Sequence, residues 1–191
     1  MVRLVVERVP ALYACCDALI TAQDVASAAR FQNEKRRNEH LAWRRVVRRE
    51  LGHDVVIDYN AVGAPTVNTP NIYISVAHGG GAVAVAFAEC RVGVDIETSE
   101  RNFERVAERY MSDEERALSD DSRWLAIVWC AKEALYKLYG ERGVELFALV
   151  VTAYDATKQT MQCSLPDGHS AEVVVSFYEE NVIVAVATFC E

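Results

Sequence analysis

Two acidic residues near the middle of the chain have the spacing of a metal site. Asp95 and Glu97 lie one residue apart in the segment VGVDIE, residues 92–97. In a β-strand, residues i and i+2 point to the same face, so these carboxylates would lie side by side and repel unless a cation lies between them. A hard cation such as Mg²⁺ takes oxygen ligands and keeps positions for water and phosphate. The alternative is an ordinary pair of acids at the solvent-facing end of a strand.

A second polar group lies in an expected helix that contains the segment WCAKEALYK, residues 129–137. Trp129, Glu133 and Lys137 recur every four residues and therefore share one stripe of the helix. Glu133 and Lys137 alone could be a surface ion pair. The surrounding positions are mostly apolar, however, so the helix is expected to be largely buried, where charged side chains need partners. If this stripe and Lys132 face the strand carboxylates, they would form a site for a metal ion and a phosphate.

A histidine beside three glycines is the third feature. His78 follows a strand-like segment and precedes Gly79, Gly80 and Gly81. Glycines have no Cβ and therefore let the backbone approach a ligand closely. The phosphate-loop pattern GxxxxGK[ST] and the dinucleotide pattern GxGxxG are both absent from the chain, so neither of those loops is predicted. A structural histidine is the alternative.

Charge is distributed unevenly along the 191 residues, whose net charge is −8. Residues 1–91 hold eleven basic and nine acidic side chains, whereas residues 92–191 hold nine basic and nineteen acidic ones. Residues 30–50 hold eight basic against three acidic side chains. Such a basic helix in an acidic protein suggests a small anionic ligand or an acidic partner protein, although composition alone favours a solvated helix face. A nucleic-acid-binding module is disfavoured, because the chain is acidic and Trp43 is the only aromatic residue in the basic run 36–49.

The composition is that of an ordinary globular protein, with 51% hydrophobic and 25% charged residues. No apolar run approaches the roughly 18–20 residues that span a bilayer, and charged residues interrupt the N-terminal segment, so neither a membrane anchor nor a signal peptide is predicted. The cysteine spacings fit no zinc or redox motif, and buried free thiols in a reducing compartment, the cytoplasm, are expected. The six cysteines are Cys15, Cys16, Cys90, Cys130, Cys163 and Cys190.

The elements that must position these residues follow the same order twice along the chain. A helix is predicted over residues 22–51 and another from 121 or 122 to 139, each followed by short strands, with Gly52 and Gly140 as helix ends. The pattern predicts an α+β fold of two lobes, residues 1–91 and 92–191. Each lobe would pack a helix on a small, mainly antiparallel sheet. The later strands are predicted at 72–76, 82–88, 91–97, 147–152, 160–165, 171–177 and 182–189.

Taken together, VGVDIE and WCAKEALYK resemble the two signature motifs of the 4′-phosphopantetheinyl transferases, and their spacing and the upstream histidine resemble the surfactin-type branch. The basic segment 31–44, the loop VGAP at 62–65 and the strand ISVAH at 74–78 resemble further parts of that family. The resemblance covers most of the chain. It implies a pseudo-dimer of two similar lobes with the active site at their interface.

The resemblance also implies a reaction. Mg²⁺ or Mn²⁺, held by Asp95, Glu97 and Glu133, would bind the pyrophosphate of coenzyme A. A serine of an apo acyl or peptidyl carrier protein would attack the β-phosphate, with Glu133 as the base, and adenosine 3′,5′-bisphosphate would leave. Phosphoryl transfer needs mainly positioning and charge neutralisation, to which Lys137 would contribute as a second catalytic residue. Fatty-acid, polyketide and peptide carriers are all candidates, and a monomeric enzyme is expected.

The implied coenzyme A contacts come from both lobes. Lys137 and Lys132 would neutralise phosphate oxygens, His78 would contact a phosphate, and Lys35 would bind the 3′-phosphate. Helpers on the basic segment would be Arg30 and Arg44.

Three positions depart from the family pattern. Ala64 stands where the loop usually offers a lysine, and Ala77 and Gly79 stand where serines usually flank the histidine. These changes remove phosphate donors, so other basic residues replace them or the affinity for coenzyme A is lower. A non-catalytic relative that binds coenzyme A or a carrier protein is the alternative function, against which the complete set of carboxylates argues.

Overall fold

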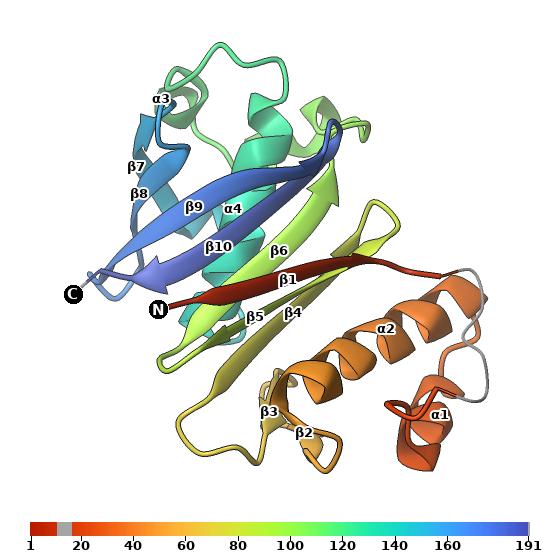
Figure 1. The fold of residues 1–191 in the computed structure, drawn as a ribbon. Helices are drawn as coiled ribbons and strands as arrows, with labels where there is room; N and C mark the ends of the chain where they lie inside the picture. Colours follow the sequence, from red (N-terminus) through yellow and green to blue (C-terminus); the bar gives the residue numbers. More distant parts are fainter. Residues whose placement is uncertain (11–16, 191) are drawn as a thin grey trace.

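The computed structural model describes residues 1–10 and 17–190, so the predicted thiols of Cys15 and Cys16 lie outside the described residues. The four described cysteines are free, as predicted, but only Cys130 and Cys163 are buried, whereas Cys90 and Cys190 are exposed. Figure 1 shows two antiparallel sheets, each accompanied by one long helix. The predicted α+β fold class is therefore confirmed.

The first sheet has the strand order β1-β5-β4 and carries α2 on one face. Its strands are β1 (Arg3–Arg8), β4 (Tyr73–Gly79) and β5 (Ala82–Ala88). Two helices and a small hairpin complete this half, namely α1 (Ala22–Ala28), α2 (Glu34–Leu51), β2 (Ile57–Tyr59) and β3 (Pro65–Val67). The single helix predicted over 22–51 is wrong in one respect, because Asn33 accepts a hydrogen bond from the backbone N–H of Arg36 and starts a new helix.

The second sheet has the strand order β6-β10-β9-β8-β7, and α4 packs on it. Its strands are β6 (Val92–Thr98), β7 (Val150–Asp155), β8 (Thr160–Ser164), β9 (Ser170–Glu179) and β10 (Val182–Phe189). The helical elements are η1 (Glu104–Arg109), α3 (Asp113–Arg116), α4 (Trp124–Tyr139) and η2 (Leu146–Ala148). The helix α4 ends at Gly140, whose φ of 70° suits a glycine cap.

The alternation of β5 explains how the halves meet. Val83, Val85 and Phe87 pack in the cluster beneath α2, whereas the small alanines between them pack with β6 and β10. Small side chains on one face of β5 let the two sheets come close together. The order β1-β5-β4 also repeats as β6-β10-β9, which supports residues 1–91 and 92–191 as two proposed lobes.

Two contacts join β4 directly to β6. The backbone N–H of Val94 donates to Ser75 Oγ at 3.0 Å, and a Cβ on Gly79 would lie only 2.2 Å from the carbonyl oxygen of Ile96. Gly79 is therefore required for packing, because any side chain there would separate the strands. This contact brings the end of β4, and with it His78, beside the acidic pair of β6.

Candidate active site

Asp95 and Glu97 lie on β6, which forms a strand as predicted, and α4 packs against this strand. Glu133, on α4, lies close enough to both carboxylates for their charges to affect its pKa. Burial raises the pKa of the Glu133 carboxyl, and the negative charges of Asp95 and Glu97 raise it further, while Lys137 opposes the shift. Glu133 is half-buried, and no hydrogen bond or ion pair joins its carboxylate to another described residue. The site thus brings three carboxylates within electrostatic reach of one another.

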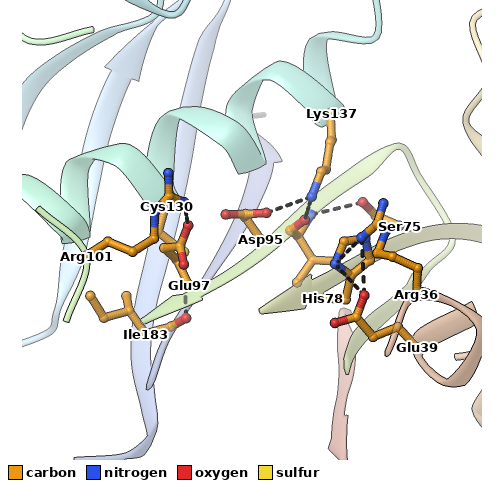
Figure 2. A network of polar contacts seen from close by, with 11 residues as sticks. Arg36, Glu39, Ser75, His78, Asp95, Glu97, Arg101, Cys130, Lys137 and Ile183 are labelled. Carbon is orange, nitrogen blue, oxygen red and sulfur yellow. Dashed lines mark hydrogen bonds and ion pairs between the residues drawn. The ribbon is translucent and has the colours of Figure 1, made fainter. Parts of the chain in front are cut away.

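Each strand carboxylate has a cationic partner within the chain. Lys137 Nζ donates to Asp95 Oδ1 at 2.8 Å and to the carbonyl oxygen of Val94 at 2.9 Å, and Arg101 forms an ion pair with Glu97. Figure 2 shows these two pairs side by side along β6, with α4 above them. Within residues 1–10 and 17–190, no three His, Cys, Asp or Glu side chains are grouped closely enough to hold a metal ion. The two carboxylates of β6 are therefore neutralised by the chain's own cations in this structure.

Gly93 sets the distance between α4 and β6. A Cβ on Gly93 would lie 1.9 Å from the carbonyl oxygen of Ala134 and 2.7 Å from the backbone nitrogen of Leu138. These are far closer than any real contact, so only glycine lets the helix backbone lie directly on the strand. The second residue of VGVDIE therefore seats Glu133 and Lys137 over the strand that carries the acidic pair.

A second polar group, formed by Arg36, Glu39 and His78, adjoins the carboxylates. His78 Nδ1 lies 3.4 Å from Glu39 Oε2 and 2.8 Å from the Arg36 guanidinium. Burial lowers the pKa of His78, Glu39 opposes this shift, and both Arg36 and Lys137 add to it. His78 is therefore close enough to Lys137 for the lysine charge to affect the pKa of the imidazole. Figure 2 shows His78 beside the Lys137–Asp95 pair.

Sequence reasoning missed Arg36, Glu39 and Arg101. Arg36 and Glu39 are three residues apart on α2, a spacing that indicates only a helix-surface pair. Nothing local links them to His78, which lies 42 residues beyond Arg36. Arg101 is four residues after Glu97, but the chain leaves β6 between them, so no helix periodicity relates the two.

The position of Lys132 contradicts its predicted role in binding coenzyme A. Its side chain is completely buried, and Nζ lies 2.7 and 2.9 Å from the two carboxylate oxygens of Glu115. Glu115 also accepts hydrogen bonds from the backbone N–H groups of Ser112 and Val151. Lys132 thus points into the core of the second half, where it ties α4 to α3 and β7.

The predicted helpers on the basic segment also differ. Arg44 is buried and pairs with Asp24 at 3.0 Å, so it is not available to a phosphate. Arg30 lies near His40, and its charge contributes to the lowered pKa of that residue. Lys35 is two-thirds exposed and lies 3.9 Å from Glu39, at the edge of the second polar group.

The structure shows what surrounds the three residues that depart from the family pattern, Ala64, Ala77 and Gly79. Ala77 is buried against the second half, and Gly79 has no room for any side chain. At Ala64 the loop is held by Asn60, and the guanidinium of Arg142, from the segment after α4, donates to the carbonyl oxygen of Ala61 at 3.1 Å. Packing against the second half thus explains why Ala77 and Gly79 stand at the two positions where the family usually has serine.

A comparison with protein families gives one match. The model described as "4'-phosphopantetheinyl transferase superfamily" matches residues 91–187, just over half of the chain. The matched range contains β6 and α4, and with them all three carboxylates. No curated protein matches the chain. In the part of the chain that the structure describes, every helix is too short or too polar to cross a membrane.

Proposed function

The chain belongs to the 4′-phosphopantetheinyl transferase superfamily, and we propose that it transfers the 4′-phosphopantetheine arm of coenzyme A to a serine of an apo acyl or peptidyl carrier protein. Adenosine 3′,5′-bisphosphate would be released. The observation that carries this proposal is that Glu133 on α4 lies near enough to Asp95 and Glu97 of β6 for their charges to raise the pKa of its carboxyl, with all three within the matched range. Superfamily membership supports a transferase in general, and the donor, acceptor and metal are parts of the proposal.

The chemistry of the donor set suits a hard divalent cation, Mg²⁺ or Mn²⁺, although the three described carboxylates would have to move closer together to hold one. Asp95, Glu97 and Glu133 supply only oxygen ligands. Burial raises the pKa of the Glu133 carboxyl, and the negative charges of Asp95 and Glu97 raise it further; a divalent cation would relieve this repulsion. Lys137 and Arg101 would release the strand carboxylates when the cation binds. The bound cation would neutralise the pyrophosphate of coenzyme A.

The side chains of this chain would then perform three tasks. Glu133 would accept the proton of the attacking serine, because a buried carboxyl with a raised pKa is suited to hold a proton. The serine oxygen would form a bond to the β-phosphorus, and the bond from that phosphorus to the bridging oxygen would break, leaving the electron pair on the nucleotide. Lys137, freed from Asp95, would neutralise the phosphate oxygens, and His78 would contact coenzyme A from the first half.

We further propose that the protein acts as a monomer in the cytoplasm, without nucleic acid or membrane. The free thiols of the described residues support a reducing compartment, and the acidic net charge argues against nucleic acid as a partner. Lys35 remains a proposed contact of the 3′-phosphate because its ammonium group is exposed beside Glu39. Lys132, Arg44 and Arg30 are left out of the proposed site.

The test is incubation with coenzyme A, Mg²⁺ and a panel of apo fatty-acid, polyketide and peptide carrier proteins, followed by intact mass spectrometry. The proposal expects one carrier to gain one phosphopantetheine, and a serine-to-alanine carrier to gain none. The non-catalytic alternative expects binding without a mass change. Failure on a carrier that a known transferase converts in parallel would contradict the proposal for that carrier class.

A further inference from the structure

The guanidinium of Arg8, at the end of β1, joins the two halves of the molecule. Nε donates to Glu179 Oε1 at 2.7 Å, and Nη2 pairs with the other oxygen of the same carboxylate. Nη1 donates to the carbonyl oxygen of Gly80 at 2.6 Å. Glu179 ends β9 in the second half, whereas Gly80 lies in the turn between β4 and β5 of the first half. Among the described residues, no other ion pair crosses between the halves.

The turn that Arg8 holds is packed closely between the two halves. A Cβ on Gly80 would lie 2.9 Å from the side chain of Val182, at the start of β10, and one on Gly81 would lie 3.0 Å from the Arg8 guanidinium. The carbonyl oxygen of Gly81 also accepts a hydrogen bond from the backbone N–H of Val9 at 2.9 Å. The turn therefore lies between the end of β1 and the turn that joins β9 to β10 (Figure 1).

The position of His78 depends on this turn. His78 pairs with Val83 across the β4–β5 hairpin, only two residues before Gly80. The Lys137–Asp95 pair, which lies beside His78, belongs to the second half, so the distance between them changes whenever the two halves shift against each other. In the proposed reaction coenzyme A is contacted from both halves, and a misplacement of about 1 Å can cost on the order of 10²-fold in rate.

The contacts of Arg8 suit alignment better than stability. The side chains of Arg8 and Glu179 are 48% and 45% exposed, and an ion pair at that exposure contributes little to the free energy of unfolding. The guanidinium, however, is a rigid planar fork, and a carboxylate bound at two of its nitrogen atoms is fixed in direction as well as in distance. Because the third nitrogen holds Gly80, one side chain sets the separation between the β9–β10 turn and the β4–β5 turn.

We propose that Arg8 is a positioning residue: bound to Glu179 and to the glycine turn, it fixes the alignment of the two halves. This alignment keeps His78 beside the Lys137–Asp95 pair. The inference rests on the proposed function, to which it adds a residue that acts through the β4–β5 turn. The affinity for coenzyme A would thus depend on an ion pair outside the proposed active site.

The experiment measures initial rates of transfer while the coenzyme A concentration is varied, with a carrier protein that the wild type modifies. The variants are R8A, R8K, E179A and R8A/E179A, and the matched control is R3A. Arg3, at the other end of β1, pairs with Glu50 at 3.0 Å and donates to the Glu50 carbonyl oxygen at 3.4 Å. Its side chain is 52% exposed, but both contacts lie within the first half. Thermal unfolding of each variant checks that the fold is kept.

We expect R8A to raise KM for coenzyme A about threefold to tenfold, which is the range for the loss of hydrogen bonds of this kind, and R3A to change it less than about twofold. The value of kcat should change little in either variant. A variant that is merely less stable would show the reverse pattern, because a smaller folded fraction lowers the apparent kcat and leaves KM unchanged. R8K should be intermediate, since lysine keeps the charge and loses the fork.

The cycle with Glu179 separates the two contacts of Arg8. E179A should raise KM less than R8A does, because Arg8 still binds the carbonyl oxygen of Gly80, and R8A/E179A should not exceed R8A. An E179A effect that adds in full to that of R8A would overturn the action of Arg8 through Glu179.

NMR resonances of the His78 imidazole test the alignment without any transfer. The chain has four histidines, and comparison with H78Q assigns the resonances of His78. We expect these resonances to move in R8A and to stay in R3A, while those of the exposed His53 and His169 stay in both. Unchanged His78 resonances in R8A, or a KM effect in R3A as large as in R8A, would overturn the proposal. If the wild type modifies no carrier, the proposed function fails, and the resonances still decide whether Arg8 holds His78 in place.

Discussion

Replacing the two lysines of α4 with methionine should have different effects: K132M should lower stability, whereas K137M should lower activity. Lys132 is completely buried against Glu115, so K132M leaves a buried carboxylate without its cation. Breaking a buried pair from one side costs about 3–5 kcal/mol of unfolding free energy. Lys137 is about 29% exposed beside Asp95, so K137M should cost no more than about 1 kcal/mol.

Activity should follow the reverse order. Charge on the transferring group develops in the transition state, so the loss of Lys137 should lower kcat more than it raises KM for the carrier protein. Removing one such stabilising group commonly costs about 10²–10³-fold. K132M that remains folded at low temperature should keep most of its turnover, because Lys132 points away from the carboxylates of β6.

Urea unfolding followed by circular dichroism, together with initial rates of transfer, measures both effects. The double variant K132M/E115Q removes the uncompensated carboxylate and should recover part of the lost stability. A stable K132M with greatly reduced turnover would refute the placement of Lys132 in the core. A K137M variant with normal turnover would reduce Lys137 to a structural partner of Asp95.

Three further predictions concern the packing and the protonation of the fold. G93A should separate α4 from β6, because the new Cβ would lie 1.9 Å from the carbonyl oxygen of Ala134; we expect a loss of at least the roughly 1–3 kcal/mol typical of overpacking, and no transfer, by the same two assays. Burial lowers the pKa of His40 to about 4, so as the pH drops the unfolded chain takes up a proton on His40 before the folded chain does. The free energy of unfolding should therefore fall between pH 6.5 and 4, by on the order of 2–3 kcal/mol more in the wild type than in H40Q. Urea unfolding across this pH range measures the difference. The raised pKa of Glu133 makes stability depend on pH in the opposite direction: the protonated Glu133 stabilises the fold, and this stabilisation is lost as the pH rises through the folded pKa, which lies above the ordinary 4.5. E133Q should therefore melt at a higher temperature than the wild type at pH 8, and it should show no transfer.

Local periodicity was sufficient to predict the main elements of the site. The spacing of Asp95 and Glu97 placed both on one face of a strand, and the four-residue repeat placed Glu133 and Lys137 on one stripe of a helix. The sequence predicted the strand β5, but it did not predict that the alanines of β5 form the contact between the two halves. A strand pattern shows that two faces differ and does not show what each face meets.

The parts that sequence could not predict depend on contacts between distant segments. Lys132 is adjacent to Glu133, and helix geometry alone does not reveal which of them turns toward the core. Glu115, the partner that decides this, is 17 residues away in another helix. Gly79 resembled a lost phosphate donor, although the strand opposite leaves it no room for a side chain. Both errors arose because a family motif was interpreted without the packing around it.

We propose that three carboxylates of the second half bind one divalent cation together with coenzyme A. Calorimetric titration of coenzyme A, with and without Mg²⁺, tests it most directly in the wild type and in D95N, E97Q and E133Q. We predict that Mg²⁺ strengthens binding in the wild type at least tenfold, which corresponds to about 1.4 kcal/mol, and that each substitution abolishes most of this gain. A gain from Mg²⁺ that persists in all three variants would contradict the claim.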